Sequence, residues 1–132
     1  MLLTARPSLT GASPLRRSAH ELAVHRWDAA TTTASSPESV PADLARDGIE
    51  EYFDSFVATA LATGAAPPTE ATIALHLRDH DVTISEHLPH PGPITTLRGS
   101  SSQLLLAMWH RIEPIHLFVA GDRSLIENWP RI

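Results

Sequence analysis

The stretch that decides the fold class is ATIALHLRDHDVTISEHL, residues 71–88. Two segments within it alternate apolar and polar side chains, which is the pattern of half-buried β-strands. The positions expected to share the inner face are Ile73, Leu75 and Leu77, followed by Val82, Ile84 and Glu86. The tripeptide DHD at 79–81 predicts a turn between the segments. We therefore expect a β-hairpin with a polar outer face.

The chain after the hairpin predicts a strand–helix–strand–helix order. The segments are a loop PHPGP (89–93), a strand ITTLR (94–98), a buried helix QLLLAMWHRI (103–112), a strand IHLFVA (115–120) and a helix RSLIENW (123–129). Ser100–Ser102 provide caps for the buried helix, and Pro114 is expected to stop it. A crossover of this kind is right-handed, and its two strands are parallel if they share a sheet.

Two helices are expected before the hairpin. Residues 42–64, ADLARDGIEEYFDSFVATALATG, follow a helical period and end at Gly64. Residues 14–30, PLRRSAHELAVHRWDAA, form the other helix, with Ser13 as its N-cap. The apolar face expected on this first helix comprises Leu15, Ala19, Leu22, Ala23 and Trp27.

The predicted organisation has four parts. Residues 1–13 lack periodicity and are expected to form a disordered leader, and 31–41 are a Thr/Ser/Pro-rich linker. Between them lies the helix 14–30. Residues 42–132 then form an α+β domain, in which a small mixed β-sheet is packed with helices.

Composition excludes several classes of function. The 132 residues suit one domain, and a net charge of −5 with no basic stripe argues against a nucleic-acid partner. The absence of cysteine excludes disulfides, Cys-ligated zinc and a protein thiol nucleophile. No segment reaches the roughly 18 apolar residues of a membrane span, and residues 1–15 do not have the pattern of a signal peptide. We expect a cytoplasmic protein with no membrane partner.

One pair of residues has the spacing of metal ligands. Glu21 and His25 are four residues apart on the first helix, so their side chains share one face. A carboxylate and an imidazole placed in this way can both bind a divalent metal such as zinc. Asp28 could orient His25 from behind, whereas His20 points about 100° away. The alternative is an ordinary solvated helix face with a Glu–His contact.

Two arginines are placed like anion-binding residues. Arg98 ends a short strand before Gly99, and Arg123 begins the last helix. The alternative for both is a surface salt bridge. The remaining histidines are expected at the surface or at its rim, and the three tryptophans, Trp27, Trp109 and Trp129, are expected to anchor the core.

Four segments together carry a resemblance to a known family. They are HELAVHRWDA, LARDGIEEYFDSFV, TLRGSSSQLLLAMWHRI and LFVAGDRSLIENW. Across roughly residues 16–129 the chain resembles the C-terminal part of the mycothiol-dependent maleylpyruvate isomerase family of actinobacteria. The resemblance implies a DinB-like helical bundle with a metal centre, followed by a smaller α+β domain. The first predicted helix then resembles the last helix of such a bundle.

The resemblance also implies a chemistry. Glu21 and His25 match two zinc ligands of the family, whose third ligand is a histidine on an early bundle helix. The metal binds the thiol of mycothiol as a thiolate, which adds to the cis double bond of the substrate. Rotation and elimination then convert maleylpyruvate to fumarylpyruvate. The C-terminal domain contributes an arginine near the site, and the resemblance does not decide between Arg98 and Arg123.

Only 20 residues precede Glu21, so we expect most of the bundle to be missing and this chain alone to be inactive. Its expected partners are a small thiol, a carboxylate substrate, and either a missing bundle or a second copy of the chain. The alternative is a non-enzymatic binding or dimerisation module in which the metal site is vestigial. An unrelated small metal hydrolase that uses the histidines is the least favoured hypothesis.

Overall fold

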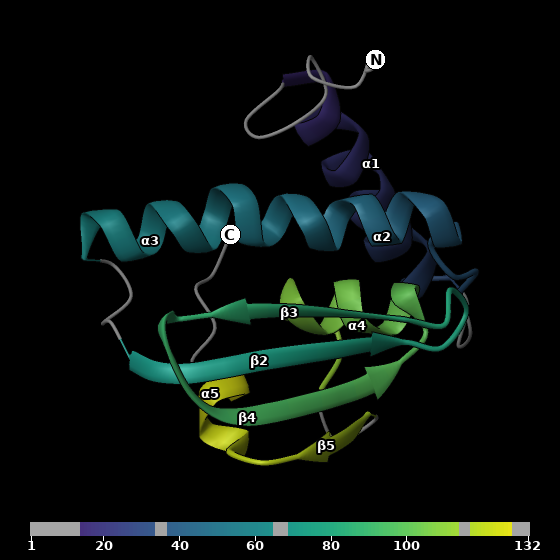
Figure 1. The fold of residues 1–132 in the computed structure, drawn as a ribbon. Helices are drawn as coiled ribbons and strands as arrows, with labels where there is room; N and C mark the ends of the chain where they lie inside the picture. Colours follow the sequence, from purple (N-terminus) through teal and green to yellow (C-terminus); the bar gives the residue numbers. More distant parts are fainter. Residues whose placement is uncertain (1–13, 34–36, 65–68, 114–116, 128–132) are drawn as a thin grey trace, which may run out of the picture.

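The structure is a computed structural model that describes residues 14–33, 37–64, 69–113 and 117–127. Its helices are α1 (Pro14–Thr31), α2 (Ala42–Glu51), the π-helix η2 (Tyr52–Val57), α3 (Ala58–Thr63), α4 (Ser101–Met108) and α5 (Arg123–Glu127). Its strands are β2 (Thr69–Leu77), β3 (Val82–His87), β4 (Pro89–Gly99) and β5 (Phe118–Ala120). The α+β class is confirmed (Figure 1).

The sheet has the order β3-β2-β4-β5. The predicted hairpin is confirmed, because β2 and β3 pair antiparallel with Leu77 opposite Val82. Burial alternates along β3, so that Val82, Ile84 and Glu86 face inward as expected. Strand β4 passes to the other side of β2 and pairs with it in parallel.

The prediction of a loop at 89–93 is wrong, because these residues begin strand β4. Pro89 pairs with Thr69, after which the register shifts at a bulge between Glu70 and Thr72. A bulge is one of the few places where a strand accepts proline. Gly92 lies so close to the neighbouring strand that a Cβ there would collide with the Glu70 carbonyl.

The expectation of parallel strands around the buried helix is also wrong, because β4 and β5 are antiparallel. Helix α4 ends at Met108 instead of continuing to residue 112. His110 then adopts a positive φ of 60° in the turn that follows α4. Strand β5 begins beside Arg98, at the end of β4 where α4 also starts. Pro114 lies outside the described residues.

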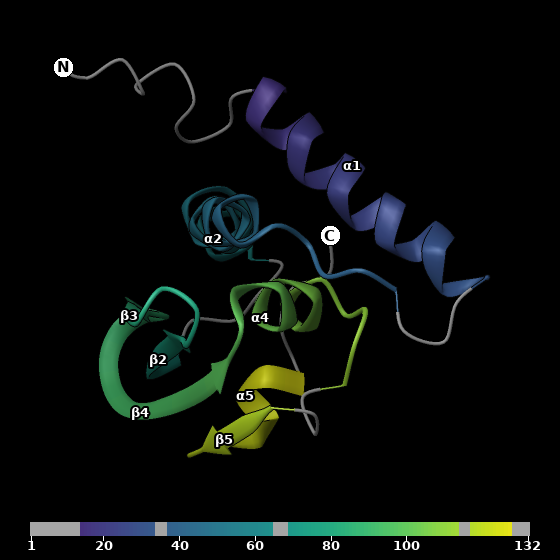
Figure 2. The ribbon, with the colours of Figure 1, turned by 90° about the vertical axis from the view of Figure 1, so that its right-hand side faces the viewer.

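The helical run over 42–63 is continuous, as predicted, although its centre is a π-helix. Gly64 ends the run with a left-handed φ of 79°. The predicted serine caps are confirmed at α4, where Ser100 and Gln103 form a reciprocal capping box. Helix α4 packs against α2 and the sheet, and in Figure 2 it lies between the sheet and α1.

The apolar face expected on α1 is not the face that packs on the rest of the chain. Leu15 and Leu22 are 76% and 70% exposed, and the buried side chains of the helix are Arg16, His20 and Val24. Trp27 still packs at the edge of the core. Because the neighbouring helix offers carboxylates at this contact, α1 turns its basic side chains toward it. Within the described ranges, no helix has both the length and the apolarity needed to cross a bilayer.

Candidate functional site

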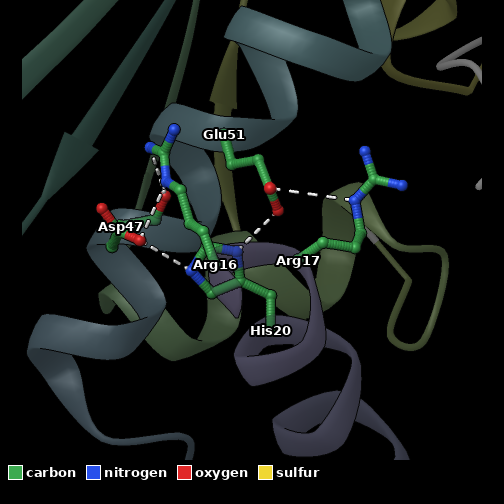
Figure 3. A network of polar contacts seen from close by, with 5 residues as sticks. All are labelled: Arg16, Arg17, His20, Asp47 and Glu51. Atoms are coloured by element: carbon green, nitrogen blue, oxygen red, sulfur yellow. Dashed lines mark hydrogen bonds and ion pairs between the residues drawn. The ribbon is translucent and has the colours of Figure 1, made fainter. Parts of the chain in front are cut away.

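Two helices meet through side chains of opposite charge (Figure 3). Arg16 and His20 are four residues apart on α1, and Asp47 and Glu51 are four residues apart on α2. Side chains at this spacing lie on one helix face. The two faces meet as complementary pairs, although 31 residues separate His20 from Glu51 in sequence.

His20 is the centre of this polar network. Its side chain is 1% exposed, and its two ring nitrogens lie 2.7 Å from Glu51 Oε1 and 2.8 Å from Asp47 Oδ2. Ionised carboxylates only accept hydrogen bonds. The ring of His20 therefore bridges the two carboxyl groups, and each of the two contacts needs one proton between its nitrogen and its oxygen.

Two arginines complete the network. Arg16 donates from Nε to Asp47 Oδ2 at 3.1 Å and from a terminal nitrogen to the Asp47 backbone carbonyl at 3.3 Å. Arg17 Nε lies 3.7 Å from Glu51 Oε2, so this contact is an ion pair without a hydrogen bond. The Arg17 guanidinium lies 4.1 Å from the centre of the Phe56 ring. The network therefore fixes the rotation of α1 on α2.

The predicted ligands lie on the other flank of α1. Glu21 is half-buried, and the His25 side chain is 65% exposed. Within residues 14–33, 37–64, 69–113 and 117–127, no three His, Cys, Asp or Glu side chains come together to hold a metal ion. The role of Glu21 and His25 stays a prediction.

Asp28 has a different main partner from the expected one. Its Oδ2 lies 3.6 Å from His25 Nδ1, which is longer than a hydrogen bond. Arg111 instead donates to both carboxylate oxygens, from Nε at 3.0 and 3.2 Å and from a terminal nitrogen at 3.1 Å. This bidentate pair joins the end of α1 to the segment that follows α4.

The structure does not bring the two candidate arginines to α1. Arg98 is exposed and lies 5.5 Å from the centre of the Phe118 ring. Arg123 is exposed at the start of α5. Asp122 precedes it in the chain, and hydrogen bonds from Ser124 lower the pKa of Asp122. The carboxylate of Asp122 is therefore a negative charge next to Arg123. In Figure 2, β5 and α5 lie on the far side of α4 from α1.

Among the described residues, the other histidines lie at the surface or its rim and the tryptophans pack at the core, as expected. The histidines at 76, 80, 87, 90 and 110 are half-buried or exposed, and Trp109 is 5% exposed in the core. Trp27 lines a groove of about 510 Å³ between α1 and the segment 38–44. His116 and Trp129 lie outside the described residues.

Comparison with protein families decides the relationship of the chain. Residues 43–128 match the model described as the MDMPI C-terminal domain. The chain belongs to this family. This confirms the resemblance to the C-terminal domain of the mycothiol-dependent maleylpyruvate isomerase family. Neither the curated proteins nor the solved structures include a match.

The family match divides the polar network between two parts of the chain. Asp47 and Glu51 lie within the MDMPI C-terminal domain, whereas Arg16 and His20 lie before it. The sequence analysis missed this network, although the two i, i+4 pairs of opposite charge were a usable signal. What the sequence did not contain was any indication that these two faces meet.

Proposed function

We propose that this chain acts in the mycothiol-dependent maleylpyruvate isomerase reaction as a domain that holds a metal-ligating helix. The observation that supports this is the docking of α1 on the MDMPI C-terminal domain through His20, Asp47 and Glu51. Docking uses the basic face of α1 and leaves His25 open to solvent at 65% exposure. A ligand pair held in this way is available to a further protein segment.

The donor types fit zinc, but the donor set is incomplete. Zinc accepts a glutamate oxygen and a histidine nitrogen, and catalytic zinc sites use three protein ligands. Glu21 and His25 supply two, and no third joins them among the described residues. We propose that the remaining donors come from a protein surface outside the described residues and that the chain alone is inactive. Zinc at such a site would favour the thiolate of mycothiol.

The first experiment measures zinc affinity by competition with a chromophoric chelator. The purified chain is expected to bind zinc, and His25→Ala is expected to lose this binding. His90→Ala is the matched control, because His90 is also an exposed histidine but lies on β4. Equal zinc binding by the wild-type and His25→Ala proteins would contradict the proposed ligand.

The second experiment is an isomerase assay with maleylpyruvate and mycothiol. We expect no turnover by the chain alone, because no third donor joins Glu21 and His25 among the described residues. Turnover by the purified chain, at a rate proportional to its concentration and abolished by His25→Ala, would refute the proposed inactivity of the chain alone.

A second candidate function is a non-enzymatic dimerisation module. The exposure of Leu15 at 76% and of Leu22 at 70% on one side of α1 favours it, because contiguous exposed apolar patches mark interaction surfaces. The two candidates differ in one measurement. A dimerisation module with a vestigial metal site associates equally well after Glu21→Ala and His25→Ala substitutions.

A further inference from the structure

A groove of about 510 Å³ lies between α1 and the segment that leads into α2. In Figure 2 this segment runs back along α1. The volume falls within the range of roughly 300–1,000 Å³ that is typical of small-molecule sites. Most of the lining side chains are apolar, namely Ala19, Leu22, Ala23, Trp27 and Ala30 from α1, and Val40, Pro41 and Leu44 from the facing wall. The groove can therefore remove an apolar body from water.

Two side chains of opposite charge line the same groove. Arg26 comes from α1, and Glu38 comes from the facing segment. Both are exposed, and among the described residues neither forms an ion pair or a side-chain hydrogen bond, either with the other or with a third residue. By contrast, Arg16, Arg17 and Asp28 of α1 each contact a side chain of opposite charge. A ligand that brings one charge of each sign is complementary to both walls of the groove.

We propose that this groove binds a small zwitterion with an apolar body, which is the chemistry shared by apolar amino acids and short apolar peptides. The carboxylate of the ligand pairs with Arg26, and its ammonium group pairs with Glu38. Its apolar body lies on the apolar lining beside the Trp27 ring. Because the apolar walls exclude part of the water, both ion pairs are stronger there than on an open surface.

The groove does not include the proposed metal ligands. Neither Glu21 nor His25 lines it, so the zwitterion binds without zinc. Failure of the zwitterion to bind would leave the proposed function standing. Failure of the chain to bind zinc would likewise leave this site standing.

The test is a titration of the full chain with the amino acid phenylalanine, followed by the amide and indole signals in proton–nitrogen correlation NMR spectra. We expect saturable shifts that include the indole signal of Trp27, which Trp27→Phe identifies by removing it. Two matched probes are phenylpropionate, which lacks the ammonium group, and phenylethylamine, which lacks the carboxylate. Each should bind at least about threefold more weakly than phenylalanine, because it leaves one charge of the groove without a partner.

Substitutions remove the two charges one at a time. Arg26→Gln and Glu38→Gln should each weaken phenylalanine binding by at least about threefold, and Arg26→Gln should leave the affinity for phenylethylamine unchanged. The matched controls Arg123→Gln and Glu50→Gln alter exposed charges outside the groove and should bind as the wild type does. Ala19→Leu should weaken the binding of all three probes, because Ala19 is an exposed position that lines the groove and a larger side chain would occupy part of it. Far-UV circular dichroism verifies that each variant is folded.

The dipeptide leucyl-phenylalanine distinguishes the two sources of the ligand. Binding at least as tight as that of phenylalanine identifies short peptides as the occupants, and weaker binding identifies free amino acids. Phenylpropionate or phenylethylamine binding as tightly as phenylalanine would overturn the zwitterion as the ligand class. The absence of saturable shifts, shifts confined to residues outside the groove, or unchanged binding in both Arg26→Gln and Glu38→Gln would overturn the site.

Discussion

Replacing His20 should destabilise the protein through the carboxylates that it leaves behind. His20→Ala removes the donor that lies 2.7 Å from Glu51 Oε1 and the donor that lies 2.8 Å from Asp47 Oδ2. Asp47 is 25% exposed and keeps its ion pair with Arg16 at 3.1 Å. The destabilisation that comes from Asp47 is therefore small. Glu51 is 1% exposed, and among the described residues its remaining charged neighbour is Arg17 at 3.7 Å. The cost therefore comes mainly from Glu51.

A buried charge that loses its partner costs about 3–5 kcal/mol. A loss of about 3 kcal/mol is a large part of the roughly 5–15 kcal/mol by which domains are stable. The double variant His20→Leu with Glu51→Leu removes the stranded charge along with its partner. We expect it to lose at least about 2 kcal/mol less than the sum of the two single leucine variants, because the two side chains act as a pair.

Urea unfolding, monitored by circular dichroism, measures these differences in stability. They follow from the shift of the urea midpoint, provided that the slope of the free energy against urea concentration is unchanged. Ser18→Ala is the matched control on α1, because Ser18 is exposed and should change the stability by less than about 0.5 kcal/mol. A loss below about 1 kcal/mol for His20→Ala, or strict additivity in the double variant, would refute the assigned role of the network.

Three further predictions concern contacts that hold the helices in place. Partial burial raises the pKa of Asp79, but hydrogen bonds from Ser101 outweigh this and lower it. The stability from this contact is therefore present above about pH 4 and lost as the pH falls further; Asp79→Asn should flatten that pH dependence of the urea midpoint. Arg111→Met should cost about 1 kcal/mol and speed amide hydrogen exchange in the last turn of α1, because it frees Asp28. Gly48→Ala should lower the stability by about 1 kcal/mol in thermal unfolding, because its methyl would lie 2.9 Å from a leucine methyl of α4 and this crowding outweighs the higher helix propensity of alanine. Unchanged values would contradict each of these three expectations.

Local patterns were sufficient to predict most of the elements. The alternation at 71–88 predicts the hairpin, and the period of 42–63 predicts the long helical run. The capping box of α4 involves only the four residues from Ser100 to Gln103, and the structure contains it. These features are readable because each depends on neighbours in the sequence.

The arrangement of the elements depends on contacts between distant residues. PHPGP has the composition of a loop, yet pairing with β2 makes it part of a strand. The direction of β5 is seen only in its antiparallel pairing with β4, which no sequence period indicates. Local composition does not indicate which distant segments will pair in the folded chain.

The same distinction applies to the candidate site. The sequence by itself determined the α+β class, the family relationship and the spacing of Glu21 and His25. Only the tertiary structure decided which face of α1 is buried. By hydrophobicity Leu15 and Leu22 should be inside, but they are exposed and His20 is buried. The physical reason is that a histidine placed between Asp47 and Glu51 can exchange its contacts with water for two charged hydrogen bonds.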